Sequence, residues 1–80
     1  MARIQPPRNM KVYYQVLTYE DKTSQLLGSV YTYSRYSKAL SMFEELSKAS
    51  NGEYLVELEA ELLDTTNNDY KYIGILGSNL

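Results

Sequence analysis

The segment from Tyr54 to Leu62 constrains the fold of this chain most strongly, because from Val56 onward its apolar and acidic side chains alternate strictly. A period of two is typical of a β-strand with one face packed on a core and the other face solvated. One face would carry Tyr54, Val56, Leu58, Ala60 and Leu62, and the other Glu57, Glu59 and Glu61. The sequence therefore predicts a half-buried strand that needs an apolar partner on one side only.

An amphipathic helix from Ser37 to Ser50 can supply that partner. Ser34 and Ser37 both fit the N-cap position, and Asn51-Gly52 supplies the left-handed residue with which helices commonly end. Between these ends, apolar residues recur at spacings of three and four, which puts them on one side of a helix. They are Tyr36, Leu40, Phe43 and Leu46. We expect this stripe to pack on the apolar face of the strand.

Three further segments have the composition of strands. Lys11 to Glu20 and Leu26 to Tyr33 are rich in β-branched and aromatic residues and flank a polar turn, so we expect a hairpin with a bulge at Gly28. Tyr70 to Leu76 follows a cluster of turn residues and is expected to pair with the alternating strand. The predicted fold is therefore α+β, a four-stranded antiparallel sheet with one helix packed on one face, in the order β-β-α-β-β.

The chain of 80 residues is short enough to form a single domain. Two prolines within residues 1–9 favour an extended N-terminal arm, because proline has no amide proton to give to a sheet or a helix. Residues 10–76 are expected to form the α+β domain, and residues 77–80 a flexible tail. Met10 also fits a natural start, in which case the arm is an extension.

The composition excludes several classes of chemistry. The chain has no Cys, which excludes disulfides, thiolate metal sites and thiol nucleophiles. It also has no His, which removes the commonest general base and the commonest metal ligand. We therefore expect neither catalysis nor a cofactor or metal. Because the sequence contains no apolar run suited to a signal peptide or a membrane span, we expect a cytoplasmic protein that does not contact membranes.

Charge is unevenly distributed along the chain. Residues 1–52 carry seven basic and four acidic side chains, whereas residues 53–80 carry one basic and six acidic side chains, for a net charge of −2. A general nucleic-acid binder is expected to present a basic stripe that neutralises phosphates. Nucleic acid is therefore not an expected partner.

Tyrosine is unusually frequent, with nine Tyr against a single Phe. Tyrosine is enriched at protein interfaces, because its ring is apolar while its hydroxyl forms hydrogen bonds. The sheet face that the helix leaves open should therefore carry an interface. Its candidate residues are Tyr13, Tyr19, Glu57, Glu59 and Glu61. The glutamate row could instead bind a metal or act in acid/base catalysis, but the solvated face of a strand explains it without such a role.

A second candidate site lies at the start of the predicted helix. Unpaired amides and the positive end of the helix dipole can hold an anion there, and Arg35 and Lys38 flank this position. We take Arg35 and Lys38 as anion-binding candidates for a nucleotide or another small phosphate ligand. The simpler interpretation is that both are solvated basic residues, which are common at the protein surface.

The run GSVYTYSRYSKALSMFEELSK and the alternating acidic strand after it resemble, in general style, small accessory proteins of bacteriophages and mobile elements. Such proteins are often short, cysteine-free and acidic. The resemblance implies a host-directed binding or inhibitory protein that acts in the host cell cytoplasm.

We predict a non-catalytic protein-interaction module, a small accessory or inhibitory protein that binds a larger protein partner. We also expect a homo-oligomer, because both faces of the first strand carry apolar groups and one helix covers only one face. Two alternatives stay open. The protein could sequester a nucleotide or another phosphate ligand, or it could be a structural subunit of a virion or larger assembly.

Overall fold

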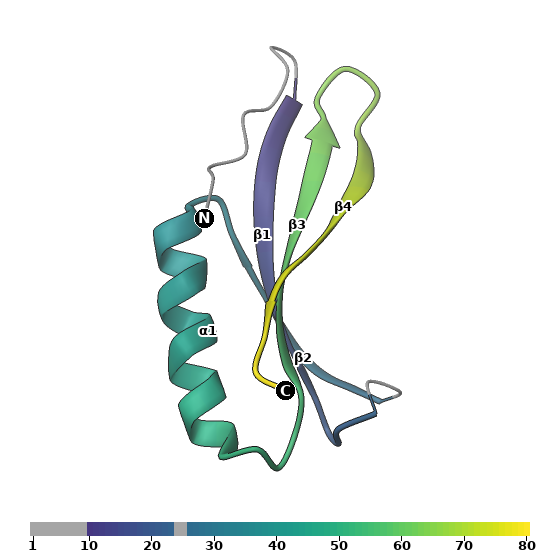
Figure 1. The fold of residues 1–80 in the computed structure, drawn as a ribbon. Helices are drawn as coiled ribbons and strands as arrows, with labels where there is room; N and C mark the ends of the chain where they lie inside the picture. Colours follow the sequence, from purple (N-terminus) through teal and green to yellow (C-terminus); the bar gives the residue numbers. More distant parts are fainter. Residues whose placement is uncertain (1–9, 24–25) are drawn as a thin grey trace.

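The computed structural model describes residues 10–23 and 26–80. The predicted arm, residues 1–9, lies outside the described residues. The described elements are β1 (Met10–Tyr19), β2 (Leu27–Tyr33), α1 (Tyr36–Ser50), β3 (Val56–Asp64) and β4 (Asp69–Ser78) (Figure 1).

Within the described residues, the strands form one four-stranded antiparallel sheet in the order β2-β1-β3-β4. The helix α1 lies along one side of this sheet (Figure 1) and packs against β1, β2 and β3. The predicted α+β architecture and the order β-β-α-β-β are therefore confirmed.

The core lies between the helix and the face of the sheet that the alternation predicts. Pairing of β1 with β3 sets Tyr14 opposite Ala60 and Val16 opposite Leu58, so these side chains share one face. The buried core consists of Tyr14, Val16, Ala39, Val56, Leu58 and Ala60. The predicted helix stripe packs against it, and the ring of Tyr36 meets that of Tyr14 edge to face with 5.3 Å between centroids. The sheet face and the helix stripe were thus predicted correctly.

The helix ends differ in how well the sequence predicted them. Neither predicted serine is the N-cap: Arg35 occupies that position, and within the described part of the chain its side chain makes no capping hydrogen bond. Packing of Tyr36 on the core therefore fixes the start of the helix more than capping does. At the other end Asn51 has a φ of 49°, and its amide donates to the carbonyl of Lys48 over 3.2 Å, as predicted for a left-handed C-terminal residue.

Both edge strands contain bulges. Thr18 of β1 pairs with Ser29 of β2, whereas Tyr19 pairs with Leu27, so Gly28 is an extra residue in β2. The predicted bulge is therefore confirmed. Within the described residues β4 has two such irregularities, one of them beside Gly74, whose φ of 153° is rarely adopted by residues with a side chain. The sequence analysis did not predict the bulges of β4.

The end of the chain is held against the start of β3. The strand β4 reaches Ser78, two residues beyond its predicted end. The Val56 amide donates to Oδ1 of Asn79 over 2.7 Å, and Nδ2 of Asn79 donates to the Tyr54 carbonyl over 3.0 Å. The Ser50 hydroxyl, which is almost fully buried, donates to the same carbonyl over 2.6 Å. The flexible tail predicted for the last four residues stays a prediction, but these bonds argue for order at Asn79.

Candidate functional site

The sheet face that points away from α1 brings the predicted interface residues together. Alternation along each strand puts the side chains that do not face the core on this side. We call this surface the open face. It comprises Leu27, Val30 and Thr32 of β2, Lys11, Tyr13, Gln15, Leu17 and Tyr19 of β1, Glu57, Glu59, Glu61 and Leu63 of β3, and Tyr70, Tyr72, Ile75 and Ser78 of β4. All five interface candidates therefore lie on one surface.

Cross-strand pairing places the glutamates between aromatic and apolar neighbours. Tyr13 of β1 lies opposite Glu61, and Glu61 lies opposite Tyr72 of β4. In the next row, Glu59 lies opposite Ile75. Directly opposed side chains on one face are close enough to interact. Each of these two carboxylates thus has an aromatic or aliphatic neighbour on β4.

Tyr72 and Ile75 were not among the predicted interface residues. Tyr72 could have been found, because counting back along the hairpin from its Asp64 and Asp69 pair sets Glu61 opposite Tyr72. Finding Ile75 would have required a bulge to be placed beside Gly74, as was done at Gly28.

Two tyrosine hydroxyls donate hydrogen bonds to the glutamate row. Tyr19 bonds the carboxylate of Glu57, and Tyr72 bonds that of Glu59. Burial, this hydrogen bond and the nearby carboxylates raise the pKa of Tyr19 to about 12. The pKa of Tyr72 is raised by the same kinds of cause, burial first. Both phenols therefore remain protonated donors at neutral pH.

Glu59, the central glutamate of the row, is disfavoured in its ionised form. Burial raises the pKa of Glu59, and repulsion from Glu57 and Glu61 raises it further, while the hydrogen bond from Tyr72 acts in the opposite direction. A cation placed over the row would relieve this repulsion. The open face therefore carries a strip of negative charge along β3.

Two leucines at the Tyr19 end of the sheet are buried, Leu17 on the open face and Leu55 immediately before β3. Leu17 and Leu55 are each 8% exposed. Leu17 lies between Val30 of β2 and Glu57 of β3, and the Tyr19 amide donates to the Leu55 carbonyl over 2.9 Å. The end of the open face near Tyr19 thus has an apolar floor, the kind of setting in which aromatic side chains contribute most to binding.

The glutamate row lacks the arrangement of a metal centre. Among residues 10–23 and 26–80, no group of three His, Cys, Asp or Glu side chains is placed to hold a metal ion. In an extended strand, alternate side chains project about 7 Å apart, which spreads the three carboxylates instead of converging them.

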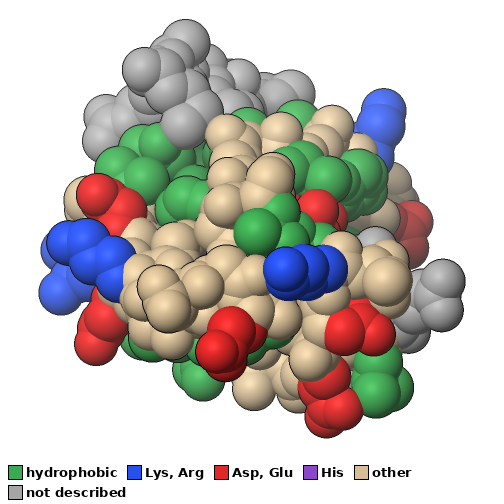
Figure 2. Space-filling model, turned by 60° about the horizontal axis from the view of Figure 1, so that its bottom comes forward, with side chains coloured by type: hydrophobic (Ala, Val, Ile, Leu, Met, Phe, Trp, Pro, Cys, Tyr) green, Lys and Arg blue, Asp and Glu red, His purple; other side chains and the backbone are tan. Residues whose placement is uncertain are grey.

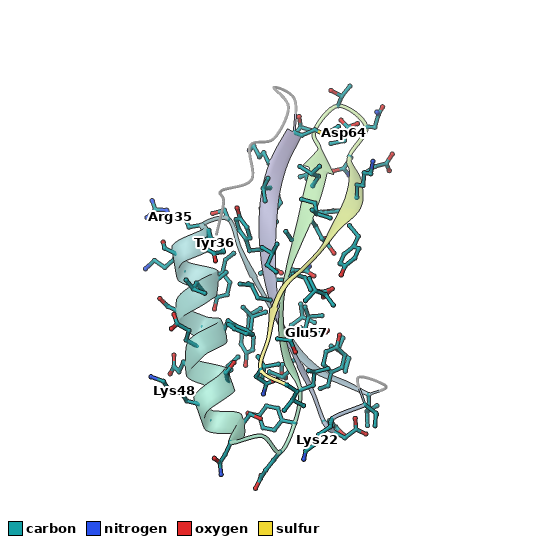
Figure 3. All side chains as sticks on the ribbon, in the orientation of Figure 1. Lys22, Arg35, Tyr36, Lys48, Glu57 and Asp64 are labelled. Carbon is teal, nitrogen blue, oxygen red and sulfur yellow. The ribbon has the colours of Figure 1, made fainter. Side chains whose placement is uncertain are left out.

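The two anion-binding candidates lie elsewhere on the molecule. Arg35 is the N-cap of α1, Lys38 lies in its first turn, and both are exposed. Figure 3 shows Arg35 at the outer end of the helix, far along the molecule from Glu57 on the sheet. The two predicted sites are therefore separate surfaces. Figure 2 shows basic side chains standing apart from one another among acidic and apolar groups on the face turned toward the viewer.

A shallow groove of about 350 Å³ runs between the C-terminal half of α1 and the end of β4. It is lined by Phe43, Glu44, Ser47, Lys48, Ser78 and Asn79. The amide of Asn79 is already engaged with the start of β3, and the Ser47 hydroxyl donates to the Phe43 carbonyl over 2.6 Å. Two polar side chains of this groove, those of Ser47 and Asn79, thus form hydrogen bonds within the fold itself.

Comparisons with protein-family models, with curated proteins and with solved structures give no match to this chain. In the part of the chain that the structure describes, no helix combines the length and the apolar character needed to cross a membrane.

Proposed function

We propose that this protein is a non-catalytic interaction module that binds a larger protein through the open face. The observation that carries the proposal is the row of Glu57, Glu59 and Glu61, flanked by tyrosines of β1 on one side and by Tyr72 of β4 on the other. Aromatic rings around a central strip of charge are typical of recognition surfaces.

The chemistry of the open face indicates the kind of partner. Three carboxylates in a row favour a segment or surface that presents Arg or Lys. Burial raises the pKa of Glu59, and the charges of Glu57 and Glu61 add to this effect. Tyrosine adds large contact area at a small cost in conformational entropy, because only two torsions are fixed. The proposed partner is therefore a protein with a basic surface, which the domain would block or bridge.

Charge reversal tests this proposal. The variant Glu57→Lys, Glu59→Lys should lose at least about tenfold in affinity, mainly through a slower on-rate and most strongly at low salt. The variant Glu44→Lys, Glu45→Lys makes the same change in net charge at two exposed positions of α1 and is the matched control. Partners retained from a lysate of the source cell would be identified by mass spectrometry, and affinities would then be measured with the purified partner.

Two results would contradict the proposal. The first is a partner whose affinity depends on Glu44 and Glu45 but not on the open face. The second is submicromolar calorimetric binding of a nucleotide that disappears in the Arg35→Ala, Lys38→Ala variant, which would instead establish the sequestering function.

A further inference from the structure

The strand β2 is an unprotected edge of the described sheet. It lies at the end of the order β2-β1-β3-β4, and the chain carries no charged residue from Leu26 to Ser34. Four apolar side chains there are exposed, to between 38% and 55%. They are Leu26, Leu27, Val30 and Tyr31.

Proteins usually protect such an edge, because its outward amides and carbonyls can pair with any other strand. The opposite edge, β4, has the usual protection: its pairing is interrupted twice, and Asp69 and Lys71 place charges near one end. By contrast, β2 pairs without interruption from Ser29 to Tyr33, the bulge at Gly28 lying at its beginning. Of the two edge strands, β2 can therefore accept a further strand more easily than β4.

We propose that β2 pairs antiparallel with β2 of a second copy of this chain, which joins the two sheets edge to edge. An uncharged strand imposes no electrostatic repulsion on its own copy, and antiparallel pairing about a two-fold axis lets each residue supply both sides of the contact. The β-branched and aromatic side chains Val30, Tyr31 and Thr32 favour cross-strand pairs. Face-to-face pairing through the open face is disfavoured, because it would set the glutamate rows of two copies against each other.

The geometry has a consequence for the open face. Antiparallel pairing of two identical edges requires a two-fold axis perpendicular to the sheet, so both helices lie on one side and both open faces on the other. The dimer would then present two glutamate rows on one surface. The edge contact does not depend on the proposed function, because it is made by the backbone of β2 and the glutamate row lies on β3, although the side chains of Val30 and Thr32 lie on the open face.

Light scattering on the full chain tests the pairing. The protomer mass is 9.2 kDa, so the unmodified protein at high micromolar concentration should give twice this value. Val30→Lys should return it to the protomer mass or raise the dissociation constant at least about tenfold, because a charge is placed at the paired edge. Ile75→Lys introduces the same side chain at an exposed position on the other edge strand and should leave the dimer intact.

Thr32→Lys provides a second disruption at an exposed position, in case Val30→Lys weakens the fold, and circular dichroism would check folding of each variant. Amides of β2 should also exchange more slowly with solvent at high than at low protein concentration. A protomer mass for the unmodified chain at high micromolar concentration would overturn the inference, as would a dimer lost in Ile75→Lys but kept in Val30→Lys and Thr32→Lys. Glu57→Lys, Glu59→Lys should remain dimeric, which separates this test from that of the open face.

Discussion

The sheet face on which α1 packs, which we call the covered face, and the open face are formed by the same strands. Their side chains differ in how much of their surface is exposed to water. On the covered face Val16, Val56 and Ala60 are fully buried by the helix, so that face contributes stability through removal of apolar surface from water. On the open face Glu59 stays partly hydrated beside Tyr72, which is 53% exposed. A strict period of two thus produces one face that holds the fold together and one whose side chains stay in contact with solvent.

The largest expected effect on stability comes from truncating a core side chain on the covered face. Leu58→Ala should lower the free energy of unfolding by about 2–5 kcal/mol, because Leu58 is 1% exposed and its removal leaves a cavity between β3 and the helix. On the open face, Ile75→Ala truncates a side chain that is 53% exposed and should cost less than about 1 kcal/mol. Urea unfolding followed by circular dichroism would measure both. Equal losses in the two variants would mean that the faces are assigned wrongly.

A smaller effect on stability is expected at Asn79, whose side chain joins the end of β4 to the start of β3. Asn79→Ala should cost about 1–3 kcal/mol, because it leaves the Val56 amide and the Tyr54 carbonyl without the Asn79 side chain as partner. Ser78→Ala is the matched control, since its hydroxyl bonds only the exposed backbone of Leu80. If Asn79→Ala is as stable as Ser78→Ala and its last residues exchange freely with solvent, the predicted flexible tail is correct.

The parts of the fold that follow from periodicity were predictable. Alternation in β3 fixed which side chains face the helix, and spacings of three and four in α1 fixed the stripe that meets them, because both patterns are imposed by burial. The left-handed residue at the end of the helix and the bulge at Gly28 were also predictable, since each depends on a local backbone preference.

Features that depend on long-range contacts were not predictable. Ser34 and Ser37 are good N-caps in isolation, but the helix starts where Tyr36 reaches Tyr14, a contact between segments far apart in the sequence. The role of Asn79 has the same origin, because its partners lie at the start of β3. On the open face the glutamates and the tyrosines of β1 were predictable from alternation, whereas the position of Ile75 depends on the bulge beside Gly74, which was not predicted.

The smallest expected effect is on the pH dependence of stability and comes from Glu59, in the glutamate row of the open face. Burial, followed by the charges of Glu57 and Glu61, raises the pKa of Glu59 above its ordinary value of 4.5. The native state therefore binds this proton more tightly than the unfolded state does. The resulting stabilisation is fully present below pH 4.5 and is lost as the pH rises through the native pKa, so the ionised group weakens the fold at neutral pH.

Glu59→Gln removes this titration and keeps an oxygen that can accept the hydrogen bond from Tyr72. The free energy of unfolding of the variant, relative to the unmodified chain, should therefore rise as the pH is raised from 4 to 7. The gain should be on the order of a few tenths of a kcal/mol, because Glu59 is partly hydrated and solvent screens its neighbours, and it should shrink in high salt. Urea unfolding across this pH range would measure it, with Glu44→Gln on the exposed side of α1 as the control that removes one charge away from the row. A relative stability that instead rises toward low pH would mean that the Tyr72 hydrogen bond outweighs burial and repulsion, and that the row is already satisfied without a cationic partner.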